Sequence, residues 1–200
     1  DVERSRGLGD VYKRQHQDND DKDKNSNLNK NQNSDQDSDS ADSEETDKQS
    51  SEEGIHTYEV ITADMTWDEA YNDCIKRGGY LARINSREEW NAIIAQIQAS
   101  NTEACYFYVS GTRNDGGSSY YWKNENGELY GEPLNSSAFW GNDLWLENEP
   151  SFQDGDVTED AMAILYMKSA NRWVLNDVAN NPLETESYLS GKIAYICEYE

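Results

Sequence analysis

Carboxylates are the most abundant side chains in this sequence that could do chemistry. The 200 residues include 40 Asp and Glu against 17 Lys and Arg, for a net charge of −23. Carboxylate and amide oxygens are the ligands that calcium prefers, and the stretch from Gly131 to Asp160 is rich in both. A connection of this length is usually functional or disordered, and its aromatic residues favour an ordered one. The alternative is that these acids are solvated and serve solubility.

The histidines and cysteines form no recognisable catalytic or zinc-binding arrangement in the sequence. The two histidines, His16 and His56, belong to no Ser/His/Asp or zinc-ligand arrangement in the sequence. Three cysteines leave one unpaired, and Cys105, which precedes an apolar run, is expected to be a buried free thiol. No feature of the sequence identifies two acids as the catalytic carboxylate pair of a glycosidase. We therefore expect a binding protein and not an enzyme.

The negative charge also limits the partners. A domain this acidic repels phosphate backbones and anionic lipids, so nucleic acid and membrane surfaces are not expected to bind it. No stretch of the sequence approaches the ~20 apolar residues that a membrane span requires.

The composition divides the chain into three parts. Residues 1–15 fit neither neighbour and are expected to be a non-native leader. Residues 16–54 consist almost entirely of Asp, Glu, Asn, Ser, Gln and Lys. Such a segment buries too little apolar surface to offset its ordering entropy, and we expect a disordered acidic linker that acts as a spacer. Residues 55–200 contain all six Trp and are expected to form one domain.

Two helices followed by strands must position the acidic stretch. Residues 66–69 and 86–89 each have the Ser/Thr-x-x-Glu pattern of a capping box, and apolar residues recur behind each on one helix face. The pair Gly78-Gly79 ends the first helix. The predicted strands are 80–84, 106–110, 120–123, 161–168, 172–175 and 193–199. This order predicts an α+β fold with a mostly antiparallel sheet and one long loop region.

Several motifs, in this order, resemble a known family. They are Trp-Asp-Glu-Ala-Tyr-Asn-Asp-Cys at 67–74, Gly-Gly-Tyr-Leu-Ala-Arg-Ile-Asn-Ser at 78–86, Trp-Leu-Glu-Asn-Glu-Pro-Ser at 145–151, Glu-Asp at 159–160, Leu-Asn-Asp at 175–177 and Tyr-Ile-Cys-Glu at 195–198. Together they resemble the C-type lectin-like domain over about residues 57–199, in a bacterial-type form. The sequence departs from the family at Ser151, where the family has Asn, and at Leu175, where it has Trp.

The resemblance implies a disulfide, a cation and a ligand. Cys74 would pair with Cys197, and the bond between Glu149 and Pro150 would be cis. One calcium ion, and the sugar that it binds, would be held by residues from two loops, namely Glu149, Ser151, Glu159, Asn176 and Asp177. The ion would take two vicinal sugar hydroxyls as its remaining ligands. The family's second disulfide would need cysteines near Ala161 and Asn180, and this sequence has none there.

The expected function is therefore recognition of a glycan or glycoprotein outside the cell or at its surface. Glu at position 149 favours mannose, fucose or glucose-type diols. The alternative is a calcium-independent, protein-binding adhesion module of the same fold, which Ser151 and the missing second disulfide favour. Trp140 and Trp145 are the candidates for stacking on a sugar, with core packing as the other possibility. The remaining tryptophans, at 67, 90, 122 and 173, are expected in the core.

Overall fold

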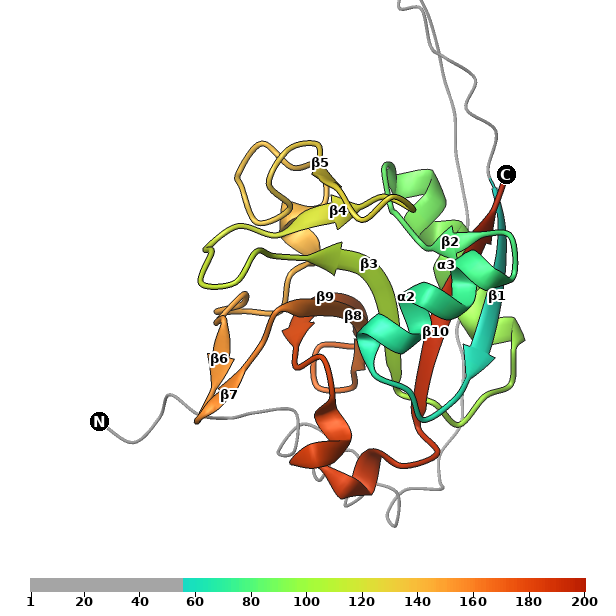
Figure 1. Cartoon of the computed structure of the whole chain (residues 1–200). Coiled ribbons are helices and arrows are strands. Elements are labelled where there is room, and N and C mark those ends of the chain that lie inside the picture. The colour runs from blue at the N-terminus through green and yellow to red at the C-terminus, as the bar shows by residue number, and fades with distance from the viewer. Residues whose placement is uncertain (1–55) are drawn as a thin grey trace, which may run out of the picture.

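The computed structural model describes residues 56–200, which form an α+β fold of two helices and a mostly antiparallel sheet (Figure 1). The predicted fold class is confirmed. The predicted leader at 1–15 and the acidic linker at 16–54 lie outside the described residues.

The two helices begin at the predicted caps. Helix α2 (Trp67–Lys76) has a complete capping box, because the Thr66 side chain accepts from the Glu69 amide and the Glu69 carboxylate accepts from the Thr66 amide. Helix α3 (Arg87–Ala99) is capped by Ser86. Its predicted box is only half formed, since the Glu89 carboxylate reaches the Asn85 amide instead of the Ser86 amide. The cap still satisfies two backbone donors.

The main sheet has the order β1–β10–β3–β4–β5, with β2 added to β10, β8 to β3 and β9 to β8. Among the described strand pairs only β10–β3 is parallel. A separate two-stranded ribbon, β6–β7, lies within the long loop. The strands are β1 (Thr57–Thr62), β2 (Tyr80–Leu81), β3 (Tyr106–Thr112), β4 (Tyr121–Lys123), β5 (Leu129–Tyr130), β6 (Gln153–Asp154), β7 (Val157–Thr158), β8 (Ala161–Met167), β9 (Arg172–Val178) and β10 (Ile193–Tyr199).

Several strands differ from the prediction, among them β1, β2 and β9. Strand β1 was not predicted, yet all six of its residues pair with β10. The strand predicted at 80–84 ends at Leu81, and the backbone amide of Arg83 donates to the Glu198 carboxylate instead of a strand carbonyl. Strand β9 continues to Val178, three residues beyond its predicted end. Asn176 and Asp177 therefore lie on a strand and not on a loop.

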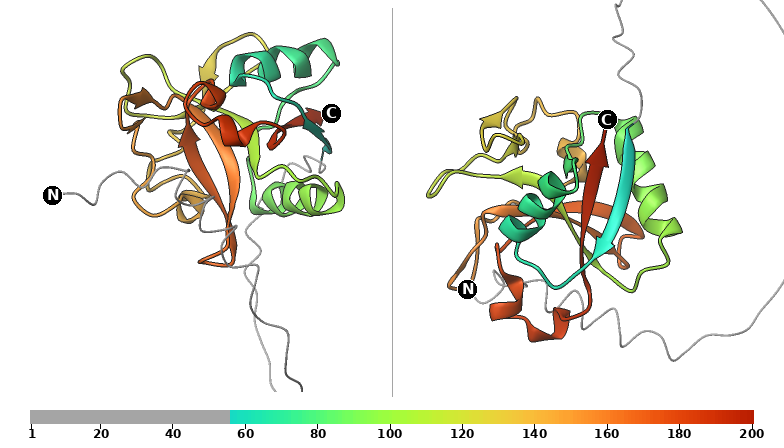
Figure 2. Two further views of the ribbon diagram at one scale, coloured as in Figure 1. Left: turned by 90° about the horizontal axis from the view of Figure 1, so that it is seen from below. Right: turned by 45° about the vertical axis from the view of Figure 1, so that its right-hand side comes forward.

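A hydrophobic cluster lies on each side of this sheet because successive strand residues point to opposite faces. Val109 of β3 and Ile196 of β10 belong to the cluster that includes residues of α3. Their neighbours Tyr108 and Tyr195 belong to the cluster that includes residues of α2. Figure 2 shows the two helices on opposite sides of the β1–β10 pair. The sheet is thus fixed from both sides and gives the long loop a rigid base.

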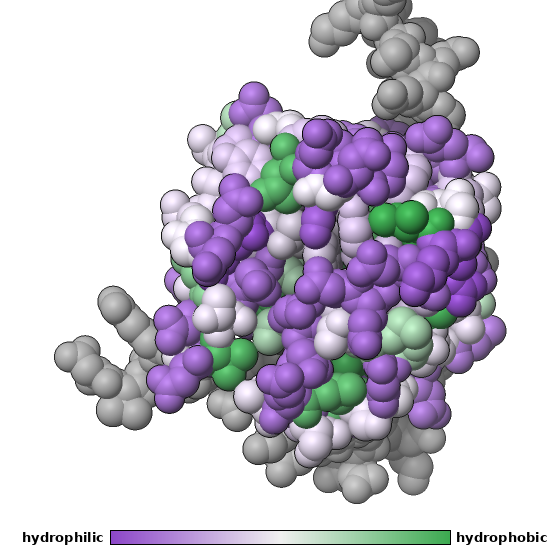
Figure 3. Space-filling model, viewed as in Figure 1, coloured by the Kyte–Doolittle hydropathy of each residue, from purple (hydrophilic) through white to green (hydrophobic). Residues whose placement is uncertain are grey.

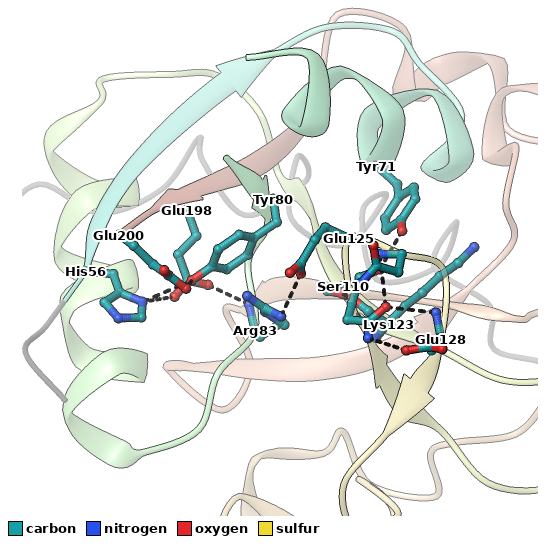
Figure 4. A network of polar contacts seen from close by, with 12 residues as sticks. His56, Tyr71, Tyr80, Arg83, Ser110, Lys123, Glu125, Glu128, Glu198 and Glu200 are labelled. Carbon is teal, nitrogen blue, oxygen red and sulfur yellow. Dashed lines mark hydrogen bonds and ion pairs between the residues drawn. The ribbon is translucent and has the colours of Figure 1, made fainter. Parts of the chain in front are cut away.

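The two ends of the domain are joined by a buried carboxylate (Figure 4). Glu198 is 1% exposed, and one of its oxygens lies 2.5 Å from Nδ1 of His56. The other oxygen accepts from the Arg83 amide at 2.8 Å. The guanidinium of Arg83 stacks over Tyr80, 3.6 Å from the ring centroid. This network connects the residue before β1 to β10 and to the segment that follows β2.

His56 should make the stability of this junction depend on pH. The hydrogen bond to Glu198 raises the pKa of His56, and the charges of Glu198, Glu89 and Glu200 add to this effect. A folded-state pKa above the unfolded value means that the imidazolium stabilises the fold fully below about pH 6.5, and that this contribution is lost as pH rises through the folded pKa. The loss of unfolding free energy in His56→Gln should therefore be larger near pH 6 than near pH 8.5. Urea unfolding of both proteins at the two pH values measures this, and an equal loss at both would contradict it.

Candidate metal centre

The loop that carries the first predicted acid is anchored to strand β9. Trp145 follows the short helix η1 (Asn142–Leu144), is 6% exposed and donates from Nε1 to the Leu134 carbonyl at 2.8 Å. It forms a bridge to Leu175, and the next amide, of Leu146, donates to the Leu175 carbonyl at 2.9 Å. These bonds bring the Glu149 segment to the end of β9. Trp145 is thus a core residue, so of the two possibilities for this side chain core packing is the correct one, and its buried ring is not available to stack on a sugar.

Three predicted carboxylates converge next to this anchor. Glu149, Glu159 and Asp177 each offer an oxygen atom, and these atoms all lie within 4.8 Å of one another. Glu149 precedes a cis peptide bond to Pro150, as the resemblance implied. Glu159 lies between β7 and β8, and Asp177 lies on β9. Residues that are far apart in the sequence therefore meet in one acidic cluster, which we call the carboxylate cluster.

Ser151 completes one side of the carboxylate cluster. Its hydroxyl donates to Oε2 of Glu159 at 3.1 Å, and its amide donates to Oδ1 of Asp177 at 3.3 Å. The amide of Phe152 donates to Oδ2 of Asp177 at 2.7 Å. Asp177 is fully buried and is held by backbone donors. This differs from the loop position that the sequence suggested, because the extension of β9 carries Asp177 into the interior.

Asn176 is adjacent to the cluster in sequence, but its side chain is engaged differently. Its Nδ2 donates to the Asp177 carbonyl at 2.7 Å. Its Oδ1 is buried and has no hydrogen-bond partner among the described residues. Four of the five predicted ligands are thus in close contact with one another. The fifth, Asn176, lies next to Asp177 on β9 and has a buried oxygen without a hydrogen-bond partner among the described residues.

The carboxylate cluster carries excess negative charge. Burial raises the pKa of Glu149 to about 7. Burial, and then the charges of Asp177 and Glu149, raise the pKa of Glu159 to about 9. Among the ion pairs of residues 56–200, none joins a Lys or Arg to these three acids. Buried carboxylates without a counter-ion are costly.

A hard divalent cation fits this donor set. The available ligand atoms are carboxylate, hydroxyl and amide oxygens, the type that calcium prefers, with no thiol or imidazole among the predicted five. Oε2 of Glu149 is buried and has no hydrogen-bond partner in the described part of the chain. An ion at this position would neutralise the charge of Asp177, which adds to the effect of burial in raising the two pKa values.

Three further residues next to the cluster were not predicted as site residues. Arg113 donates hydrogen bonds to the Glu159 and Phe152 carbonyls. The hydroxyl of Tyr120 donates to the Glu159 carbonyl and to Oδ2 of Asp177. The ring of Phe152 stacks on Tyr120. No motif marks these positions, because two of them act through main-chain carbonyls that are far away in sequence.

The cysteines differ from the sequence expectation in part. All three are free thiols in the structure. Cys74 and Cys197 are both buried, and Sγ of Cys197 lies 4.0 Å from the Cys74 carbonyl oxygen. Their disulfide is therefore not formed here and stays a prediction. Cys105 is partly exposed and not fully buried, because it lines a surface pocket of about 370 Å³ with Gln98, Ala104, Tyr166 and Trp173.

Sequence comparison agrees with this placement. The family model described as "Lectin C-type domain" matches residues 63–179, a range that includes all five predicted ligands. A human protein, C-type lectin domain family 4 member A, is 28% identical over 121 residues. That alignment covers 60% of this chain and 44% of the human protein, so the chain spans less than half of that relative.

Solved structures share the fold. Human lithostathine aligns with 74% of this chain and 85% of its own, at 15% identity and a TM-score of 0.50. The C-type lectin CEL-I from Cucumaria echinata aligns with 73% of this chain and 91% of its own, at 15% identity and a TM-score of 0.51. Within residues 56–200, no helix has the length and apolar character needed to cross a membrane.

Proposed function

Because this chain belongs to the family of C-type lectin domains, we propose that it is a recognition module that binds carbohydrate through calcium. The observation that carries the proposal is the carboxylate cluster, in which oxygens of Glu149, Glu159 and Asp177 lie within 4.8 Å of one another. A bound calcium ion would supply open coordination positions that two vicinal hydroxyls of a sugar fill. The protein's part is to hold the ion and to orient the sugar hydroxyls by hydrogen bonds.

Each of the five predicted ligands has a separate role in this proposal. Glu149, Glu159 and Asp177 supply charge and oxygen ligands. Ser151 is exposed, and its hydroxyl adds a weak neutral ligand in place of an amide. Asn176 supplies the oxygen that lacks a partner. Glu at position 149 supports a preference for mannose, fucose or glucose-type diols, whose hydroxyls match this arrangement in the family.

The location of the protein follows from the same proposal. We infer that the domain acts outside the cell or at its surface, where it meets glycans and glycoproteins. In such an oxidising compartment the neighbouring thiols of Cys74 and Cys197 would be able to pair. Recognition, and not catalysis, is the proposed role.

A calcium-independent module that binds a protein is the second candidate. Its support is the raised pKa of Glu149, to about 7, and of Glu159, to about 9. Protonation of both acids would remove two of the three negative charges of the cluster without an ion. Against it, Figure 3 shows a mainly polar face with apolar residues in small separate spots. Tyr130, at 39% exposed, is the large apolar side chain that stands out at the described surface.

Glycan binding with and without calcium separates the two candidates. The full chain should bind immobilised mannose-, fucose- or glucose-terminated glycans in millimolar calcium and release them in chelator. Ser151→Asn should bind the same glycans more tightly, because an amide oxygen is a better calcium ligand than a neutral hydroxyl. Thr158→Asn, which adds an amide at an exposed position of the same loop, is the matched control and should bind like the wild type. Binding that is equal in calcium and in chelator would contradict the proposal.

A further inference from the structure

The base of the carboxylate cluster is held by one arginine. Arg113 follows β3, and its three guanidinium nitrogens donate to three different carbonyls of the chain. Nε donates to Glu159 at 2.8 Å, Nη1 to Gly117 at 2.6 Å and Nη2 to Phe152 at 3.0 Å. The guanidinium carbon also lies 5.3 Å from the centre of the Phe152 ring. A single side chain thus fixes the backbone on both sides of the β6–β7 ribbon.

One tyrosine connects this backbone to strand β9. Tyr120 is fully buried, and its hydroxyl lies 2.6 Å from the Glu159 carbonyl and 3.0 Å from Oδ2 of Asp177. Its ring stacks on Phe152, with centroids 6.0 Å apart and planes 7° apart. The amide of Phe152 donates to the same Asp177 oxygen. Tyr120 therefore touches the backbone of one proposed ligand and the carboxylate of another.

These contacts oppose the repulsion within the cluster. Like charges at short range in a poorly solvated site favour separation of the loop from the strand. No cysteine lies between residues 106 and 196, so no disulfide can hold the loop in place. Arg113 directs its donors to carbonyls and not to the three carboxylates, so it fixes the loop without supplying the counter-charge that a cation would bring.

We propose that Arg113 and Tyr120 are positioning residues that hold Glu159 and Asp177 together before a cation binds. This inference rests on the proposed function. It attributes the fixed arrangement of the ligands to residues that do not themselves bind the ion. Residues that orient metal ligands typically change metal affinity by roughly 10- to 100-fold when they are replaced. We expect a weakening of calcium binding in that range for Tyr120→Phe and for Arg113→Ala.

Two matched variants control for unrelated losses. Tyr108→Phe also removes a fully buried hydroxyl, one that has no partner among the described residues. Arg172→Ala also removes an arginine that donates to two loop carbonyls, those of Asp143 and Trp145. Both controls should bind calcium like the wild type. Arg113→Lys keeps the charge but cannot span three carbonyls, so it should bind as weakly as Arg113→Ala.

Two measurements on the full chain test the inference. Calcium titration gives the affinity, and millimolar methylguanidinium should recover part of it in Arg113→Ala but have no effect on Arg172→Ala. Amide hydrogen exchange in chelator gives the order of the loop without any ion. The amides of Ser151 and Phe152, which donate to Asp177, should exchange faster in Arg113→Ala and Tyr120→Phe than in the controls.

The outcomes separate this inference from the proposed function. If the wild type binds no calcium but the two amides lose protection in both variants, the positioning role stands and the calcium proposal fails. If the wild type binds calcium while both variants bind it with unchanged affinity, or keep the two amides protected, the positioning role is wrong.

Discussion

Millimolar calcium should raise the melting temperature of this protein by roughly 5–10 °C above its value in chelator. An ion that binds only the folded state stabilises it by about 2.7 kcal/mol at a free concentration 100 times its dissociation constant. For a domain of this size each kcal/mol shifts the melting temperature by about 2–4 °C. The physical source is the neutralisation of three carboxylates, those of buried Glu159 and Asp177 and half-buried Glu149, that have no Lys or Arg partner in the described chain.

Differential scanning calorimetry of the full chain measures this shift. Magnesium at the same concentration is the control, and it should give a smaller shift because it requires octahedral geometry and keeps its water ligands. A melting temperature that is the same in calcium and in chelator would mean that the carboxylate cluster does not bind calcium. The protein-binding candidate would then be preferred.

Glu159→Gln should remove the effect of calcium and at the same time stabilise the protein in chelator. The pKa of Glu159 is raised to about 9 by burial and by the neighbouring charges of Asp177 and Glu149. An acid whose folded-state pKa is raised lowers stability as pH rises from its unfolded value of about 4.3 towards the folded value. Glutamine has the same shape without the charge, so near pH 8 the gain should be on the order of 1–2 kcal/mol.

Denaturant unfolding in chelator, near pH 5 and near pH 8, checks the second prediction. The stability of the wild type should fall between these values more than that of Glu159→Gln. Glu147→Gln removes an exposed acid of the same loop and should leave both the pH dependence and the calcium shift unchanged. If Glu159→Gln keeps the calcium-induced rise in melting temperature of the wild type, calcium binds elsewhere.

Elements whose pattern is complete within a short stretch of sequence could be predicted. The cap of α2 connects residues three apart, and the apolar run of β10 has its predicted bounds of 193–199. Both patterns are complete within a short window and can be recognised there, although β10 itself forms by pairing with β1, β2 and β3. This explains why the helices and several strands could be predicted from the sequence.

Strands that depend on distant partners could not be delimited in this way. Strand β1 exists because β10 pairs with its whole length, although more than 130 residues separate the two. Strand β9 continues through Asn176 and Asp177 because β8 pairs with both. A run of polar residues resembles a loop in the sequence, but the partner strand and the buried Asp177 contacts make it a strand.

The five predicted ligands came from family motifs and not from spacing in this chain. The carboxylate cluster agrees with those motifs for Glu149, Ser151, Glu159 and Asp177. Arg113 and Tyr120 lie outside the motifs, and they act on carbonyls 46 and 39 residues away. Such contacts leave no periodic or compositional trace in a single sequence.

Calorimetric titration of the full chain with calcium, near pH 8, tests the central proposal most directly. We expect the wild type to bind one ion per chain at the carboxylate cluster and Glu159→Gln to show no binding heat under the same conditions. A wild type that shows no heat at millimolar calcium, or a Glu159→Gln protein that binds calcium as the wild type does, would contradict the assignment of Glu149, Glu159 and Asp177 as a calcium site.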